Sequence, residues 1–129
     1  MGTWGAGNLE NDYALDELSD RSAKLIKSMM ARARRKSSRE GDEHDYTTLF
    51  VEFEIVFALD SKGLLMSGSL PTPEEVEKLK VSFLADWEPY YQDSLEAKPD
   101  HLKKRRQCIA ATFNRFKRIC IKHQESPRG

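Results

Sequence analysis

Residues 46–63 read YTTLFVEFEIVFALDSKG, and the conformation of this stretch decides the fold class. Its apolar residues match a helical spacing at Tyr46, Leu49, Phe50, Phe53, Val56 and Phe57. They also match the alternation of a strand at Val51, Phe53, Ile55, Phe57 and Leu59. The length of the stretch and Gly63 near its end favour the helix, and the chain holds no second strand-like run to pair with a strand. We therefore predict a central helix over residues 46–60, with a strand as the alternative.

Another helix is predicted before this stretch. Residues 12–36 place apolar side chains at spacings of three and four, as one face of a helix requires. Asn11 or Asp12 is suited to cap its amino end, and its acids precede its bases, which complements the helix dipole. The polar residues 37–45 indicate a loop, in which Asp42 or Asp45 is placed to cap the next helix.

Two further helices are predicted after the central one. Thr72, Pro73 and Glu75 form a helix start signal, in which a capping residue is followed by a proline and a glutamate. This helix is expected to end or kink at Pro89, with a linker over residues 88–100. The helical period resumes from Asp100, and one side of the last helix carries Leu102, Ile109, Phe113, Phe116 and Cys120.

Four helices with short to medium connections predict an all-α fold, either a four-helix bundle or a small orthogonal helical array. The length suits one domain over residues 1–129, with a glycine-rich segment over 1–10 and a flexible tail over 124–129. No apolar run reaches the roughly 20 residues that span a bilayer. Cys108 and Cys120 are too far apart on one helix to pair, so we expect buried free thiols and a cytoplasmic location.

The charges are segregated along the chain although 21 bases balance 21 acids. Residues 1–20 hold five acids and no base, 21–39 eight bases and no acid, 40–60 seven acids and no base, and 101–129 nine bases and one acid. Such a block can dock onto an oppositely charged partner. Alternatively, neighbouring blocks can neutralise one another within the fold.

The residue types that catalysis or a cofactor needs do not converge in this sequence. GAGNLE, residues 5–10, begins like a dinucleotide fingerprint, but it lacks the third glycine and a preceding strand. His101 and Cys108 are separated by about 10 Å of helix rise, which is too far for direct contact. We therefore predict no enzyme activity, no metal and no cofactor.

Binding of a protein partner is the function that the charge pattern favours. The segment REGDEHD, residues 39–45, and the helix after it carry the candidate partner-binding residues Glu40, Asp42, Glu43, Asp45, Glu52 and Glu54. An acidic surface of this kind can steer a basic protein, including a nuclease, toward its binding site. The alternative is a nucleic-acid-associated regulator that binds phosphates through Arg105, Arg106, Arg115 and Arg118 of a basic C-terminal helix.

The first 18 residues, MGTWGAGNLENDYALDEL, resemble the start of a bacterial family of unknown function, domain of unknown function family 4259. The matching positions are Gly2, Trp4, Gly5, Gly7, Leu9, Asn11, Asp12, Ala14, Asp16 and Leu18. The resemblance implies a small, mainly helical bacterial protein and brings no established activity with it. By analogy with small helical inhibitors, we expect an immunity protein that neutralises a bacterial toxin by direct binding. Trp4 is expected to fold under the first helix as a structural residue.

Overall fold

The structure, a computed structural model, describes residues 3–40, 43–66, 68, 70–94 and 98–125. These residues form five helices and no strand: α1 (Asp12–Arg34), α2 (Lys36–Arg39), α3 (Glu43–Ser61), α4 (Pro73–Ser94) and α5 (Pro99–Glu125). The predicted all-α fold is confirmed, and residues 46–60 are helical. Most of the predicted tail, residues 126–129, lies outside the described residues.

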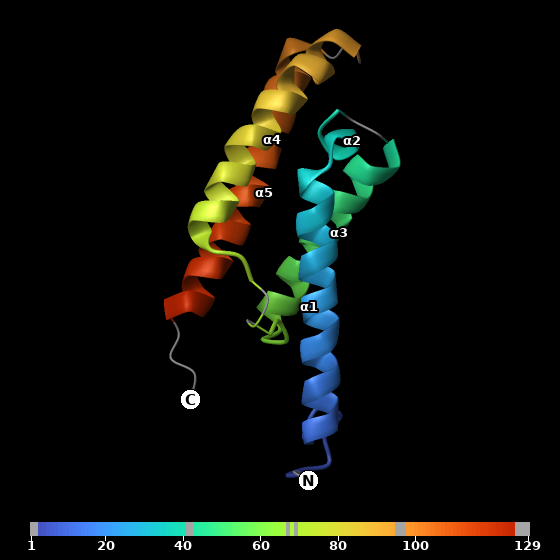
Figure 1. The fold of residues 1–129 in the computed structure, drawn as a ribbon, viewed down its shortest axis with the longest axis vertical. Helices are drawn as coiled ribbons and strands as arrows, with labels where there is room; N and C mark the ends of the chain where they lie inside the picture. Colours follow the sequence, from blue (N-terminus) through green and yellow to red (C-terminus); the bar gives the residue numbers. More distant parts are fainter. Residues whose placement is uncertain (1–2, 41–42, 67, 69, 95–97, 126–129) are drawn as a thin grey trace.

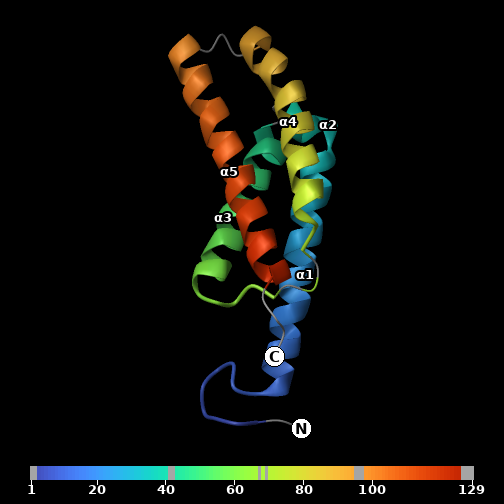
Figure 2. The ribbon, with the colours of Figure 1, turned by 90° about the vertical axis from the view of Figure 1, so that its left-hand side faces the viewer.

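The helices pack in two layers. α4 and α5 run along each other in one layer, and α3 crosses α1 obliquely in the other, with the one-turn α2 beside α3 (Figure 1). α3 also packs against α5, which crosses it in the side view (Figure 2). The contact between α3 and α5 therefore joins the two layers.

α3 supplies the centre of the core because apolar residues occupy several of its sides. The ring of Phe53 stands edge-on to Phe113 and Phe116 of α5, with ring centroids 5.1 and 5.7 Å apart. Phe50 meets Phe83 of α4 in the same way at 5.9 Å. Edge-to-face pairs of this kind are favoured by the ring quadrupoles. The buried residues of α3 are Leu49, Glu52, Phe53, Val56 and Phe57, which is a helical and not a strand spacing.

The predicted amino-terminal caps are present at two helices. The side-chain oxygen of Asn11 accepts a hydrogen bond from the backbone N–H of Ala14 at 2.8 Å, which caps α1. The hydroxyl of Thr72 accepts one from the backbone N–H of Glu75 at 3.2 Å, which caps α4. Each cap satisfies a backbone donor that has no partner within its own helix.

Gly63 ends α3, as the sequence predicts. Its φ is +69°, a left-handed conformation that glycine adopts without strain. The backbone N–H of Gly63 donates to the carbonyl of Asp60 at 3.0 Å, and that of Leu64 donates to the carbonyl of Leu59 at 2.8 Å. This pair of bonds is the Schellman arrangement, which satisfies the last carbonyls of a helix.

Two of the predicted connections are wrong in part, because some of their residues are helical. Arg35 is extended and ends α1 two residues earlier than the predicted limit, and α2 then forms within the predicted loop 37–45. Asp45 does not cap α3, since it lies inside that helix; Asp42, the other candidate cap, lies outside the described residues. The charged side chains of this connection have other partners, described below.

α4 continues past Pro89 to Ser94, so the predicted linker over residues 88–100 is wrong for its first half. A proline inside a helix removes the hydrogen bond to the carbonyl four residues before it, here Ala85. Pro89 and Ala85 are both exposed, so water can solvate that carbonyl. The lost bond therefore falls on the outer face of α4, where it disrupts no core contact.

α1 belongs to the core along only its second half. Its buried residues are Ser22, Ile26, Met29, Met30 and Ala33. The described residues before Ser22 are half-buried or exposed. Both views show the beginning of α1 extending beyond the other helices (Figures 1 and 2).

Candidate protein-interaction surfaces

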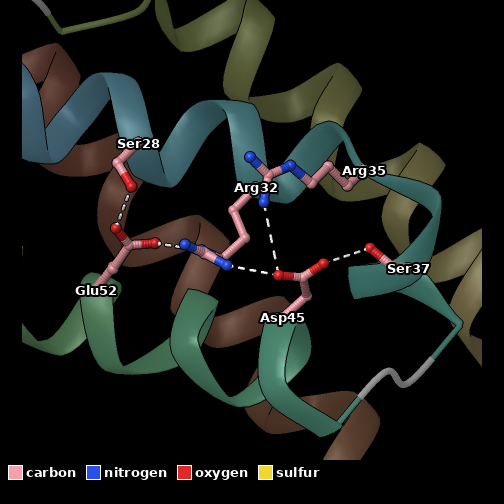
Figure 3. A network of polar contacts seen from close by, with 6 residues as sticks. All are labelled: Ser28, Arg32, Arg35, Ser37, Asp45 and Glu52. Carbon is pink, nitrogen blue, oxygen red and sulfur yellow. Dashed lines mark hydrogen bonds and ion pairs between the residues drawn. The ribbon is translucent and has the colours of Figure 1, made fainter.

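A network centred on Arg32 links α1 to α3 (Figure 3). The guanidinium of Arg32 pairs with Oδ1 of Asp45 at 2.6 Å and with Oε1 of Glu52 at 3.0 Å. The hydroxyl of Ser28 donates to the second oxygen of Glu52 at 2.6 Å. The side chain of Glu52 is 11% exposed and that of Arg32 is 16% exposed, so these charges balance one another largely away from water.

Asp45 has more hydrogen-bonding and positively charged partners in this network than Glu52 has. Ser37 donates a hydrogen bond to its Oδ2, and Arg35 lies 3.5 Å from its Oδ1, the oxygen that Arg32 also contacts. The hydrogen bond from Ser37, together with the positive charge of Arg32 and Arg35, lowers the pKa of Asp45 despite its partial burial. Asp45 is therefore held ionised by its neighbours within the chain.

The six acids predicted to bind a partner are not brought together on one exposed surface. Asp45 and Glu52 face inward, because both are used to balance Arg32. Glu40 is half-buried, with Lys36 3.6 Å away, whereas Glu54 is exposed on α3. Asp42 and the side chain of Glu43 lie outside the described residues. The basic block 21–39 and the acidic block 40–60 thus neutralise each other in part, which is one of the two readings of the charge pattern.

The basic helix α5 also uses its charges within the fold. The guanidinium of Arg105 lies 4.7 Å from the ring centroid of Phe50, and that of Arg115 lies 4.4 Å from the centroid of Phe57. Arg106 is 3.5 Å from Glu88 of α4. Of the four arginines named for nucleic-acid binding, Arg118 alone is exposed without an ion pair or ring contact among the described residues.

The two cysteines differ in environment, and the prediction that both are buried is wrong for Cys108. Cys108 is exposed, whereas Cys120 is 2% exposed. Burial raises the pKa of the Cys120 thiol to about 12, so that it is protonated at neutral pH and is a poor nucleophile. Cys120 therefore behaves as a small core residue.

His123, three residues after Cys120, contacts a carboxylate of another helix. Its ring nitrogen Nε2 lies 3.1 Å from Asp60 of α3, which Lys122 also contacts at 2.7 Å. Burial alone would raise the pKa of Asp60, but the hydrogen bonds from Lys122 and His123 outweigh it and lower that pKa. This cluster joins α5 to the end of α3.

Metal-binding groups and membrane-spanning helices were both sought along the part of the chain that the structure describes. No three His, Cys, Asp or Glu side chains there are arranged to hold a metal ion. No helix in the same part combines the length and the apolar content needed to cross a bilayer.

Residues 3–20 form a surface that we call the N-terminal arm. Its first part is a short hairpin, in which the backbone N–H of Trp4 donates to the carbonyl of Glu10 at 3.0 Å and Thr3 pairs with Asn11. The prediction that Trp4 folds under the first helix is wrong, since Trp4 is 55% exposed. Tyr13 is 69% exposed in the first turn of α1. The arm thus presents two aromatic side chains to solvent on a segment with five acids and no base.

The glycines of the arm accommodate its own glutamate. A Cβ atom added at Gly5 would lie 1.8 Å from a carboxylate oxygen of Glu10, and one added at Gly7 would lie 2.3 Å from the other. The backbone N–H of Gly7 donates to this carboxylate at 3.1 Å. The carboxylate of Glu10 therefore fills the space beside Gly5 and Gly7.

A second candidate surface lies on the outer side of α3. We call it the α3 groove, a depression of about 560 Å³ lined by Tyr46, Thr47, Phe50, Val51, Glu54, Ile55, Ala58 and Arg105. Val51 and Ile55 are 52% and 45% exposed. Sequence reasoning missed this surface. Its signal was present in residues 46–60, which carry apolar side chains on more sides than one buried face requires.

Comparison with known proteins identifies no relative, because no family model, no curated protein and no solved structure matches the chain. The resemblance of the first 18 residues to domain of unknown function family 4259 stays a prediction.

Proposed function

We propose that the protein is a protein-binding module whose N-terminal arm docks onto a basic surface of its partner. The observation that carries the proposal is the exposure of Trp4 and Tyr13 on an arm with five acids and no base. Exposed tryptophan and tyrosine are the side chains most often found at the energetic centre of protein interfaces. Acids around them attract a basic surface and hold it in register.

The geometry of the arm also supports docking. Because its part of α1 extends beyond the other helices, a partner can contact the arm without displacing any core residue. Glu17 and Asp20 pair with Arg21 and Lys24 one turn later, at 2.8 and 2.9 Å, through exposed bridges that are weak in water. A basic partner can therefore compete for these two acids at low cost.

The partner that we propose is a bacterial toxin domain with a basic surface, which the protein neutralises by binding as an immunity protein. This step rests on analogy between small helical inhibitors, on the absence of converging catalytic residues in the sequence, and on the acidic arm. A toxin that acts on nucleic acid carries the basic surface that the arm needs. We place the complex in the cytoplasm, where the exposed thiol of Cys108 suits a reducing compartment.

Co-expression with the product of the neighbouring gene tests the proposal. The wild-type protein is expected to protect cells and to form a complex that weakens as salt rises. Trp4→Ala and Tyr13→Ala are expected to weaken that complex at least about 10-fold with unchanged thermal stability. Val81→Ala is the matched control, because Val81 is a similarly exposed apolar residue on α4.

Three outcomes would contradict the proposal at different points. Absence of both complex and protection would exclude the toxin as partner. A complex that tolerates Trp4→Ala and Tyr13→Ala would exclude the arm as its docking site. Salt-dependent binding to duplex DNA, lost on Arg118→Ala, would instead support the nucleic-acid alternative.

A further inference from the structure

The α3 groove is an exposed apolar surface that the arm of the same chain cannot cover. Val51 and Ile55 lie at its centre, about half exposed. Ser28 of α1 contacts Glu52, which is adjacent to Val51. The groove is therefore level with Ser28 along the axis of α1. The arm ends at Asp20, eight residues before Ser28, a rise of about 12 Å along the helix, and the rest of it lies farther away, beyond the other helices. The N-terminal arm of the same chain therefore does not cover the groove.

The residues along the groove form a stripe that is complementary to itself. Thr47, Val51, Ile55 and Ala58 follow one another at spacings of four, four and three, so they share one face of α3. If this face packs antiparallel against an identical one, Val51 opposes Ile55 and Thr47 opposes Ala58. Each residue of the stripe then contacts its counterpart in both directions, as the contact of two chains related by a two-fold axis requires.

The charges beside the stripe are complementary to themselves as well. Glu54 is exposed on the groove, and Arg105 and Arg115 of α5 border α3 through their stacking on Phe50 and Phe57. Along the axis of α3, Glu54 lies between Phe50 and Phe57. A two-fold axis near the middle of α3 therefore places Glu54 of one copy between the two arginines of the other. Opposite charges in one patch favour pairing of that patch with its own copy.

We infer that a second copy of this chain covers the α3 groove, giving a two-fold symmetric dimer in which the two α3 helices pack antiparallel. The contact is limited to about three turns of helix and the adjacent arginines. The surface area that each copy buries in such a contact is smaller than the roughly 800 Å² that each partner buries in a stable complex. The dimer is therefore a weak and reversible one. It leaves both N-terminal arms outside the interface, so it is independent of the proposed toxin binding.

Sedimentation velocity of the 129-residue chain tests the dimer without any toxin. We expect the average mass to rise to twice that of one chain between about 1 µM and about 1 mM, the range expected of a weak interface. Val51→Glu and Ile55→Glu are expected to keep the protein monomeric throughout. Val81→Glu adds the same charge at an exposed valine of α4 and is expected to dimerise like the wild type, as is Trp4→Ala. Circular dichroism establishes that each variant is folded.

Disulfide cross-linking tests the antiparallel register. In a Cys108→Ser background, which lacks the exposed native thiol, a mixture of Val51→Cys and Ile55→Cys chains is expected to form linked dimers faster than either variant alone. Residues 51 and 55 oppose each other across the axis, whereas two copies of residue 51 are offset by about 6 Å along the helix. A wild-type protein that stays monomeric, or loss of the dimer with Val81→Glu, would overturn the inference. Faster linking of one variant with itself would overturn the register.

Discussion

Arg32 of α1 and Glu52 of α3 form an ion pair of 3.0 Å, and the same guanidinium holds Asp45 at 2.6 Å. One cation thus balances two carboxylates that come from the acidic block of the sequence. Ser28 and Ser37 complete the arrangement with hydrogen bonds to the two carboxylates. The stability of the contact between α1 and α3 is therefore expected to depend on Arg32.

Arg32→Met is expected to lower the free energy of unfolding by about 2 to 4 kcal/mol, because it leaves the partly buried Glu52 without a counter-charge and Asp45 with only that of Arg35. Urea denaturation followed by circular dichroism measures the change. Arg34→Met is the matched control, since Arg34 is exposed and has no ion pair among the described residues. We expect it to change stability by less than about 0.5 kcal/mol. Equal effects of the two substitutions would show that the network contributes nothing.

Acid is expected to destabilise the protein partly through Asp45. Its pKa is lowered in the folded state, first by the hydrogen bond from Ser37 and then by the charges of Arg32 and Arg35. The unfolded chain therefore binds a proton more readily once the pH falls below about 4, the ordinary range of an aspartate. Stability is lost as the pH falls through the folded pKa. Asp45→Asn should flatten the fall in unfolding free energy below that pH; an unchanged slope would contradict the assignment.

Gly63→Ala is expected to cost about 1 to 2 kcal/mol of stability, because Gly63 has a φ of +69° that a residue with a Cβ adopts with strain. Gly68→Ala is the control. A Cβ atom at either glycine meets open space, so the two substitutions differ in backbone conformation and not in packing. Thermal unfolding of both variants tests this, and a Gly68→Ala loss as large as that of Gly63→Ala would refute the conformational explanation.

The two thiols are expected to react at very different rates with a disulfide reagent. Cys108 is exposed and should react in the folded protein. Cys120 is buried with a pKa of about 12, so it should react at the rate at which the protein opens. Mass spectrometry after timed labelling locates the modified residue, and Cys108→Ser should abolish the fast phase. Rapid labelling of Cys120 in that variant would place it outside the core.

The parts of the fold that depend on neighbouring residues were predictable from the sequence. Asn11, Gly63 and Thr72 cap or end helices through bonds that span a few residues, so the local pattern identifies them. The carboxyl end of α4 was not predictable in the same way. Pro89 is tolerated inside the helix because its missing bond faces water, and a single sequence does not show which side of a helix faces water.

The candidate surfaces were harder to predict because charge and exposure depend on packing between distant segments. Glu52 looks like a surface residue between Val51 and Phe53, but packing of α3 on α1 turns it toward Arg32. Val51 looks like a core residue, but the same packing leaves it exposed. The sequence shows both charged blocks, but it does not show that their side chains form ion pairs with one another in the fold.

The division of α1 at Ser22 has a consequence for the dynamics of the protein. Residues after this point are held by the core, so their amide hydrogens should exchange with solvent only when the whole domain unfolds. The turns before it are held by the Asn11 cap and two surface ion pairs, so they should open on their own and exchange many times faster. A single continuous helix would then contain two units of different cooperativity. Removing the first of them by proteolysis should leave the rest of the domain folded.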